Sequence, residues 1–190
     1  MNHTTRETYL ASATEYLAPL FTAHGFPLPA VRASVGIPAG GKGKKLKAIG
    51  QCWSNLASAD NTTEIFICPS QSDPVAVLAI LIHELVHAAV GLECGHKGAF
   101  KRVALALGLE GKMTATVPGE RLATHLLHLS DLLGDYPHAA LNTALSGRKK
   151  QGTRMIKLEC DDCGWTCRTA QKNVDAGTPT CHCGGSINVA

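Results

Sequence analysis

Apolar side chains recur at helical spacing in four stretches of the chain. These stretches cover residues 4–24, 74–90, 98–107 and 120–133. Apolar residues three or four positions apart share one face of a helix, so each stretch predicts a helix with a buried side. A glycine follows each stretch directly, which marks its end. Ser72 or Asp73 can cap the second helix, and Pro74 suits its first position.

Alternating apolar and polar residues predict strands between the first two helices. Residues 31–37 alternate clearly, residues 45–53 alternate weakly, and residues 63–68 form the clearest strand before Pro69. The tail differs from the rest, because it is rich in Cys and Gly and poor in large apolar side chains. We therefore expect a main domain over residues 1–147, a basic linker over 148–153 and a small module over 154–190.

The overall composition is that of a globular chain. It has 190 residues, of which 45% are hydrophobic and 17% charged, which suits one domain with a small module. No uncharged apolar run reaches about 18 residues, so we expect no membrane-spanning helix. The N-terminus is polar and lacks the pattern of a secretory signal, so we expect a cytoplasmic protein.

The helix over residues 74–90 contains an HExxH motif, from His83 through Glu84 to His87. Four residues advance a helix by about 400°, so the two histidines lie on one face about a turn apart. Two such imidazoles can bind one Zn²⁺, and Glu84 can reach a water on the metal. Zinc lowers the pKa of that water to about 7, so Glu84 can take its proton before the hydroxide attacks a carbonyl. The alternative, two satisfied core histidines, would bury polar groups at a high cost.

A catalytic zinc needs a third protein ligand and one open position. His96 and Glu93 both follow the helix, and Gly91 and Gly95 allow the chain to turn back toward the metal. We favour His96, and Glu93 would then be a surface or outer-shell carboxylate. Cys94 is either a buried thiol or an inhibitory fourth ligand.

The tail carries a second candidate metal site. Five of the eight cysteines lie in the last 31 residues, and in a reducing compartment such clustering indicates metal binding rather than disulfides. The predicted ligands are Cys160, Cys163, Cys181 and Cys183. They would hold a structural zinc in a ribbon that needs the metal to fold. The second pair is CxC, so Cys167 or His182 could replace one member. Cys52 and Cys68 are expected to be buried free thiols.

Basic residues gather in two places, although the formal net charge is only +3. The first cluster is Lys42, Lys44, Lys45 and Lys47. The second cluster is Arg148, Lys149, Lys150 and Arg154. Such clusters either neutralise nucleic-acid phosphates or are solvated loops. In the tail, Trp165, Arg168 and Lys172 could add stacking and charge, while Trp165 could equally form the small core of the ribbon.

Several of these pieces occur together in one family. They are Cys52-Trp53, the strand 64–67, the HExxH helix 81–88, the segment from Gly95-His96-Lys97 to Phe100, and the ribbon with Cys163-Gly164 and Arg168-Thr169. Over residues 45–110 and 154–185 the chain resembles the SprT-like (Spartan-type) zinc metalloproteases. The resemblance implies a small zincin-like α+β fold, with an N-terminal helix, a short mixed sheet and the HExxH helix, followed by the ribbon. It also implies three histidine ligands, a glutamate base and a role linked to DNA.

We therefore expect a zinc-dependent endopeptidase with one catalytic and one structural Zn²⁺. Its substrates would be DNA-associated or DNA-crosslinked proteins, bound as an added strand at a sheet edge near residues 63–67. The alternative is a non-catalytic, zinc-stabilised, nucleic-acid-binding (transcription-associated) factor, whose first metal would need a fourth protein ligand. No role is predicted for residues 111–147.

Overall fold

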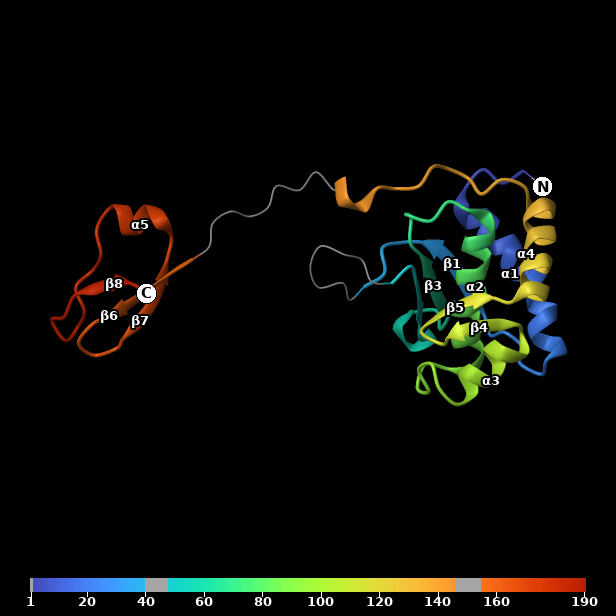
Figure 1. Cartoon of the computed structure of the whole chain (residues 1–190), viewed down its shortest axis with the longest axis horizontal. Coiled ribbons are helices and arrows are strands. Elements are labelled where there is room, and N and C mark those ends of the chain that lie inside the picture. The colour runs from blue at the N-terminus through green and yellow to red at the C-terminus, as the bar shows by residue number, and fades with distance from the viewer. Residues whose placement is uncertain (1, 40–47, 146–154) are drawn as a thin grey trace. The chain divides into compact units, whose positions relative to one another are not determined.

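The structure, a computed structural model, describes residues 2–39, 48–145 and 155–190. It is a mixed α+β chain with two compact units, residues 1–145 and 146–190 (Figure 1). The first unit contains α1 (Arg6–Ala23), β1 (Val31–Val35), β2 (Gly50–Trp53), β3 (Thr63–Ile67), α2 (Pro74–Val90), α3 (Ala99–Ala106), β4 (Leu109–Lys112), β5 (Ala115–Pro118) and α4 (Glu120–Leu133), with short 3-10 turns at Asn55–Ala57 and Thr143–Leu145. The second contains β6 (Ile156–Cys160), β7 (Thr166–Thr169), α5 (Gln171–Asp175) and β8 (Ile187–Val189).

The two longest helices begin at side-chain caps. The Thr5 hydroxyl accepts a hydrogen bond from the Thr8 backbone N–H at 3.2 Å at the start of α1. At the start of α2, Asp73 Oδ1 accepts one from the Ala76 N–H at 2.7 Å, and Pro74 follows the cap. Both caps satisfy backbone donors that have no partner within the helix. Of the two cap residues considered from sequence, the structure therefore selects Asp73.

A three-stranded sheet forms one layer of the first unit, in the order β1-β3-β2. β1 runs parallel to β3, with Val31 opposite Thr63, and β2 runs antiparallel, with Cys52 opposite Ile65. The substrate edge expected near residues 63–67 is therefore wrong, because β3 is the central strand and both of its edges are paired. The predicted strand over 45–53 begins at residue 50 among the described residues, and residues 45–47 lie outside them.

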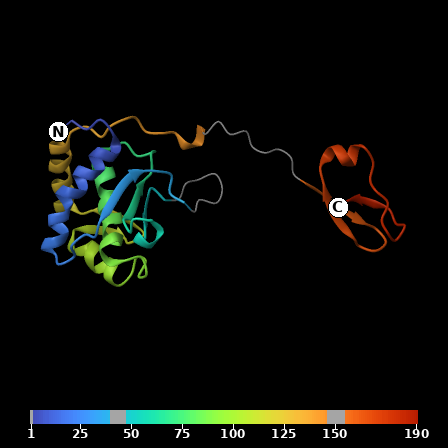
Figure 2. The same ribbon diagram turned by 180° about the vertical axis from the view of Figure 1, so that it is seen from behind.

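The core lies between this sheet and the helices. In both views α1 and α2 lie between the sheet and α4 (Figures 1 and 2). The fully buried side chains include Tyr9, Leu17, Ile65, Leu81 and Leu126, which come from all three layers. α2 is buried on most of its surface, so polar groups on it need a specific reason to be there.

A short hairpin that the sequence did not suggest joins α3 to α4. β4 and β5 pair antiparallel, with Gly111 opposite Thr116 and Lys112 opposite Ala115. The hairpin contacts α2 through β5. Part of the segment with no predicted role, residues 111–147, therefore lies against the HExxH helix.

A buried arginine, Arg6, holds the segment after α4 in place through hydrogen bonds to its backbone carbonyls. Arg6 is 5% exposed, and its guanidinium donates hydrogen bonds to the carbonyls of Pro69, Pro137, His138 and Ala139 at 2.8–3.2 Å. It also lies over the Tyr136 ring, 4.8 Å from the ring centroid. Arg6 thus ties the chain beyond α4 to the loop that precedes α2.

The second unit is a three-stranded antiparallel sheet in the order β7-β6-β8. Its core is small, and the buried members are Leu158, Cys160, Cys181 and Ile187. Trp165 is not among them and is 44% exposed, so the interpretation of Trp165 as the core of the module is wrong. With two of four core residues being cysteine, apolar burial alone gives this unit little stability.

Candidate metal centres and catalytic cleft

Three histidines of the first unit converge on one point. His83 and His87 come from α2, and His96 comes from the turn between α2 and α3. The Nε2 atom of His96 lies 3.2 Å from that of His83 and 3.3 Å from that of His87. Nitrogen ligands at roughly 2.0–2.1 Å from a tetrahedral zinc are separated by about 3.3 Å. The donor set therefore fits a metal ion of this kind.

The three imidazoles are held in the neutral form that a metal requires. Burial, with a contribution from His96, lowers the pKa of His83 to about 4. Burial and the two neighbouring imidazoles lower the pKa of His87 to about 4 as well. Burial also lowers the pKa of His96. Near pH 7 these side chains carry no charge, so their lone pairs are free for coordination.

Two features of the chain bring His96 back to α2. Gly91 ends the helix with φ of 81°, and Gly95, directly before His96, has φ of 52°, a region that favours glycine. Phe100 on α3 then lies beneath the cluster, fully buried. Its ring centroid is 5.0, 4.3 and 4.9 Å from those of His83, His87 and His96. Phe100 therefore fixes the ring positions from one side and keeps that side dry.

The competing ligands lie elsewhere. Among the described residues, the first unit's metal-competent group holds the three histidines and neither Glu93 nor Cys94. The Glu93 carboxylate folds back against Gly91, and the Cys94 thiol lies near the carbonyls of Gly91 and Gly95. His125 and His128 are exposed on α4 and do not belong to the group.

Glu84 is buried beside the cluster, with 6% of its surface exposed. Burial raises its pKa to about 7, although a backbone hydrogen bond from Cys52 opposes the shift. β2 approaches Glu84 closely because Gly50 has no side chain: a methyl group there would lie 2.5 Å from Glu84 Oε1. A carboxyl with a pKa near 7 is suited to exchange protons at neutral pH. No local sequence pattern indicates this role of Gly50, because the role depends on contact between distant segments.

Thr116 on β5 supplies a second contact that the sequence did not indicate. Its hydroxyl lies 2.8 Å from His83 Nδ1, on the ring edge opposite the cluster. If Nε2 binds a metal, Nδ1 carries the proton and donates to Thr116 Oγ1. By contrast, His87 Nδ1 is buried without a hydrogen-bond partner.

A cleft of about 600 Å³ opens over the histidine cluster and Glu84. Its floor is α2, and β2 and β5 contribute its two sides. The volume is typical of sites that enclose a small ligand or a substrate side chain. An ion held by the three histidines would therefore be accessible from solvent.

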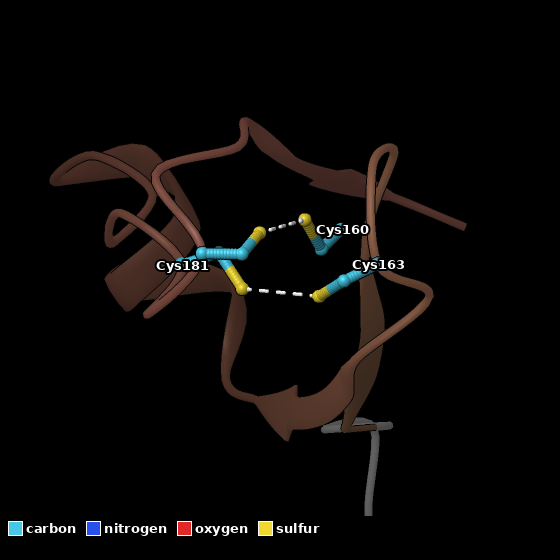
Figure 3. Close-up of side chains that lie close together, drawn as sticks. Cys160, Cys163 and Cys181 are labelled. Carbon is cyan, nitrogen blue, oxygen red and sulfur yellow. Dashed lines mark hydrogen bonds between the residues drawn. The ribbon is translucent and has the colours of Figure 1, made fainter.

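Four cysteines of the second unit form the other cluster (Figure 3). The Sγ atoms of Cys160 and Cys183 are 3.6 Å apart, and those of Cys163 and Cys181 are 3.5 Å apart. Thiolates at about 2.3 Å from a tetrahedral zinc are separated by about 3.8 Å, so the four fit one ion. Backbone hydrogen bonds, led by that of Cys163, lower the pKa of Cys160 to about 7 and favour the thiolate.

The two alternative ligands are placed differently from these four. Cys167 packs against the small core, and His182 Nδ1 lies 3.6 Å from the Cys181 sulfur, outside the four-sulfur group. The CxC pair thus contributes both of its cysteines. In the first unit Cys68 is buried, while Cys52 and Cys94 are half-buried.

The predicted nucleic-acid contacts lie mainly outside the described residues. Both basic clusters, Lys42 to Lys47 and Arg148 to Arg154, fall there. Trp165, Arg168 and Lys172 are described and are exposed.

The chain matches no protein-family model, and comparison with curated proteins and solved structures found no match. Within residues 2–39, 48–145 and 155–190, no helix has the length and apolar character needed to cross a membrane.

Proposed function

We propose that this chain is a zinc-dependent endopeptidase of the SprT-like type, with a zincin-like first unit and a zinc ribbon as its second. The observation that carries the proposal is the convergence of three Nε2 atoms next to a buried glutamate at the base of a cleft. A purely structural metal would have no need of an open cleft or of Glu84. The four cysteines would hold the second, structural zinc.

His83, His87 and His96 would hold the catalytic zinc through Nε2. When bound, the ion would polarise the scissile carbonyl and activate a water molecule for attack. Glu84, buried beside the three histidines, accepts a proton from the attacking water and then donates a proton to the leaving amine. Thr116 and Phe100 keep the imidazoles in place while the reaction proceeds.

The substrate would lie along β2 rather than β3. β2 is an edge strand of the sheet, and three of its residues, Gly50, Gln51 and Cys52, line the cleft. An extended peptide can add to such an edge through main-chain hydrogen bonds. This position would bring its carbonyl groups close to both Glu84 and the histidines.

The proposed link to DNA has support from the second unit. Lys157 and Arg168 are cross-strand neighbours on β6 and β7, and Trp165 lies exposed just before β7. Lys157 is ion-paired with Glu159, which leaves Arg168 as the cation of this pair that is available to a phosphate. A cation and an exposed indole on one small module suit the binding of a single strand, through phosphate contacts and base stacking. The substrates would then be proteins bound or crosslinked to DNA.

The direct test of the activity is cleavage of an unfolded protein by zinc-loaded wild type and Glu84→Gln. We expect cleavage by wild type and at least about 100-fold less by the variant, because the carboxamide cannot accept the proton. Zinc content should be equal in the two, since Glu84 is not a ligand. Equal cleavage by both proteins, or none by either, would contradict the proposal.

A further inference from the structure

The cleft continues well beyond the histidine cluster, along α2 toward the N-terminus of that helix. Ala76, Ala79, Ile80 and His83 all line it, and their spacing places them on one helix face. From Ala76 to His83 the helix rises about 10 Å, which is about two turns. The floor of this upstream part consists of small or apolar side chains.

The sides of the upstream part carry no charge and are mostly apolar, and Gln71, three residues before α2, adds one neutral amide to the lining. Ile49 comes from the β2 side, and Val117 and Pro118 come from β5. Among the described residues that line the cleft, Glu84 is the sole Asp, Glu, Lys or Arg. A negatively charged substrate group placed over Ala79 would therefore lose its hydration without gaining an ionic partner.

We infer that this upstream part of the cleft, formed by Ala76, Ala79, Ile80 and Val117, is a subsite for a large apolar side chain next to the scissile bond. The two alanines give the depth that such a side chain needs. Because folded proteins bury their large apolar residues, the preferred substrate is an unfolded or locally opened polypeptide segment. This inference rests on the proposed endopeptidase function, whose substrate class it specifies.

The test compares two peptides of Gly, Ser and Gln that differ at one position, Leu in one and Asp in the other. With zinc-loaded wild type we expect kcat/KM to be about 10- to 100-fold higher for the Leu peptide. Mass spectrometry should place the cut beside that Leu. Equal rates for the two peptides would overturn the inference, and this comparison needs no variant.

Filling the subsite gives a second measurement. Ala79→Leu should remove most of the preference for the Leu peptide, and Ala11→Leu is the matched control on an exposed position of α1. Zinc content should stay unchanged in both variants. An Ala79→Leu protein that is folded, zinc-loaded and as selective as wild type would contradict the assignment.

A binding measurement separates this inference from the proposed function. Fluorescein-labelled versions of the two peptides are titrated with zinc-loaded Glu84→Gln and with the double variant that adds Ala79→Leu. If no protein cleaves either peptide but the Leu peptide binds more tightly and loses this advantage in the double variant, the subsite stands and the protease activity fails. Equal binding of both peptides overturns the subsite.

A separate observation, the 2.8 Å contact between Thr116 Oγ1 and His83 Nδ1, carries a second inference. We propose that Thr116 is a positioning residue that orients the His83 ring for metal binding from the β4–β5 hairpin. Outer-shell partners of this kind commonly change metal affinity by about 10- to 100-fold. The hairpin that forms one side of the cleft would thus also set the strength of the metal site.

Competition with a chromophoric chelator measures this effect without any assay of activity. Thr116→Val keeps the branched shape but lacks the hydroxyl, so zinc at the histidine site should bind about 10- to 100-fold more weakly. Thr116→Ser should restore the affinity to within about threefold. Thr114→Val, an exposed position on the same hairpin, is the control. Unchanged zinc affinity in Thr116→Val would refute the role.

Discussion

Gly50→Ala tests how closely β2 must approach Glu84, the residue proposed as the catalytic base. The added methyl group would lie 2.5 Å from Glu84 Oε1 and 2.6 Å from Ile80 Cγ2, whereas ordinary contact begins near 3.4 Å. The φ of Gly50 lies outside the left-handed region, so alanine brings no backbone strain. The carboxylate must therefore move by roughly 1 Å, or β2 must lift away from α2.

We expect Gly50→Ala to lower the rate of cleavage and to leave the zinc content unchanged. A displacement of about 1 Å at a reacting group lowers the rate by about 100-fold, equivalent to about 2.7 kcal/mol in the barrier. Overpacking costs about 1–3 kcal/mol in stability, and the loss of glycine flexibility in the unfolded chain offsets about 0.4–1 kcal/mol. Zinc content should match wild type, because Glu84 is not among the three converging histidines.

Three measurements test this prediction: the rate of cleavage of an unfolded substrate at steady state, the zinc content, and the free energy of unfolding in urea. Gly36→Ala is the matched control, since its methyl group would lie 2.8 Å from Phe66 Cδ1, also without left-handed backbone, and Gly36 does not line the cleft. It should lose some stability and keep its activity. A Gly50→Ala protein with activity within about threefold of wild type would refute the reasoning, and so would a loss of activity caused by loss of zinc.

Four further predictions concern stability and metal content. The pKa of Glu84 is raised from 4.5 to about 7, so protonated Glu84 stabilises the fold below pH 4.5 and this contribution is lost as the pH rises through 7. In urea titrations at pH 8, metal-free Glu84→Gln should therefore be more stable than metal-free wild type by about 3 kcal/mol. A stability difference that does not change between pH 4 and 8 would contradict this. The Tyr9 hydroxyl is buried without a hydrogen-bond partner, so Tyr9→Phe should leave the free energy of unfolding unchanged or raise it by up to about 1 kcal/mol. A loss of more than about 1 kcal/mol would show that the hydroxyl does form a hydrogen bond. Arg6→Ala should lower the free energy of unfolding by about 3 kcal/mol, because four carbonyls lose their donor. Arg6→Lys should recover less than half of this loss. A loss below about 1 kcal/mol in Arg6→Ala would contradict the assigned contacts. Cys183→Ser should release one metal equivalent and leave the ion at the histidines bound, as measured by mass spectrometry under native conditions. Loss of both ions would contradict the existence of two independent metal sites.

The HExxH helix could be predicted because its signals are local. Its spacing of apolar residues, the cap at Asp73, Pro74 and the glycine at 91 all lie within or next to the helix, and the structure places α2 at Pro74–Val90. The grouping of four tail cysteines could be predicted as well, since pairs of thiols in a short tail poor in apolar residues have few other uses, and the four sulfurs lie close together. His96 was the preferred third histidine on the same local grounds, and it lies in the cluster.

Features that depend on distant pairing could not be predicted in this way. The alternation in residues 63–67 identifies a strand but not its neighbours, so it cannot show that β3 is central and β2 lies at the edge of the sheet. The β4–β5 hairpin could not be predicted, because each strand has only four residues and glycines interrupt the alternation of apolar and polar side chains. Gly50 and Thr116 matter only through contacts with Glu84 and His83, which lie 34 and 33 positions away in the sequence.

The most direct test of the central claim is one gel that follows a protein crosslinked to single-stranded DNA. Zinc-loaded wild type and Glu84→Gln are incubated with this substrate, and with the same protein free of DNA. The account predicts cleavage by wild type alone, faster for the crosslinked form. Cleavage by neither protein, while both still retard the DNA, would contradict it and identify a zinc-stabilised nucleic-acid-binding protein instead.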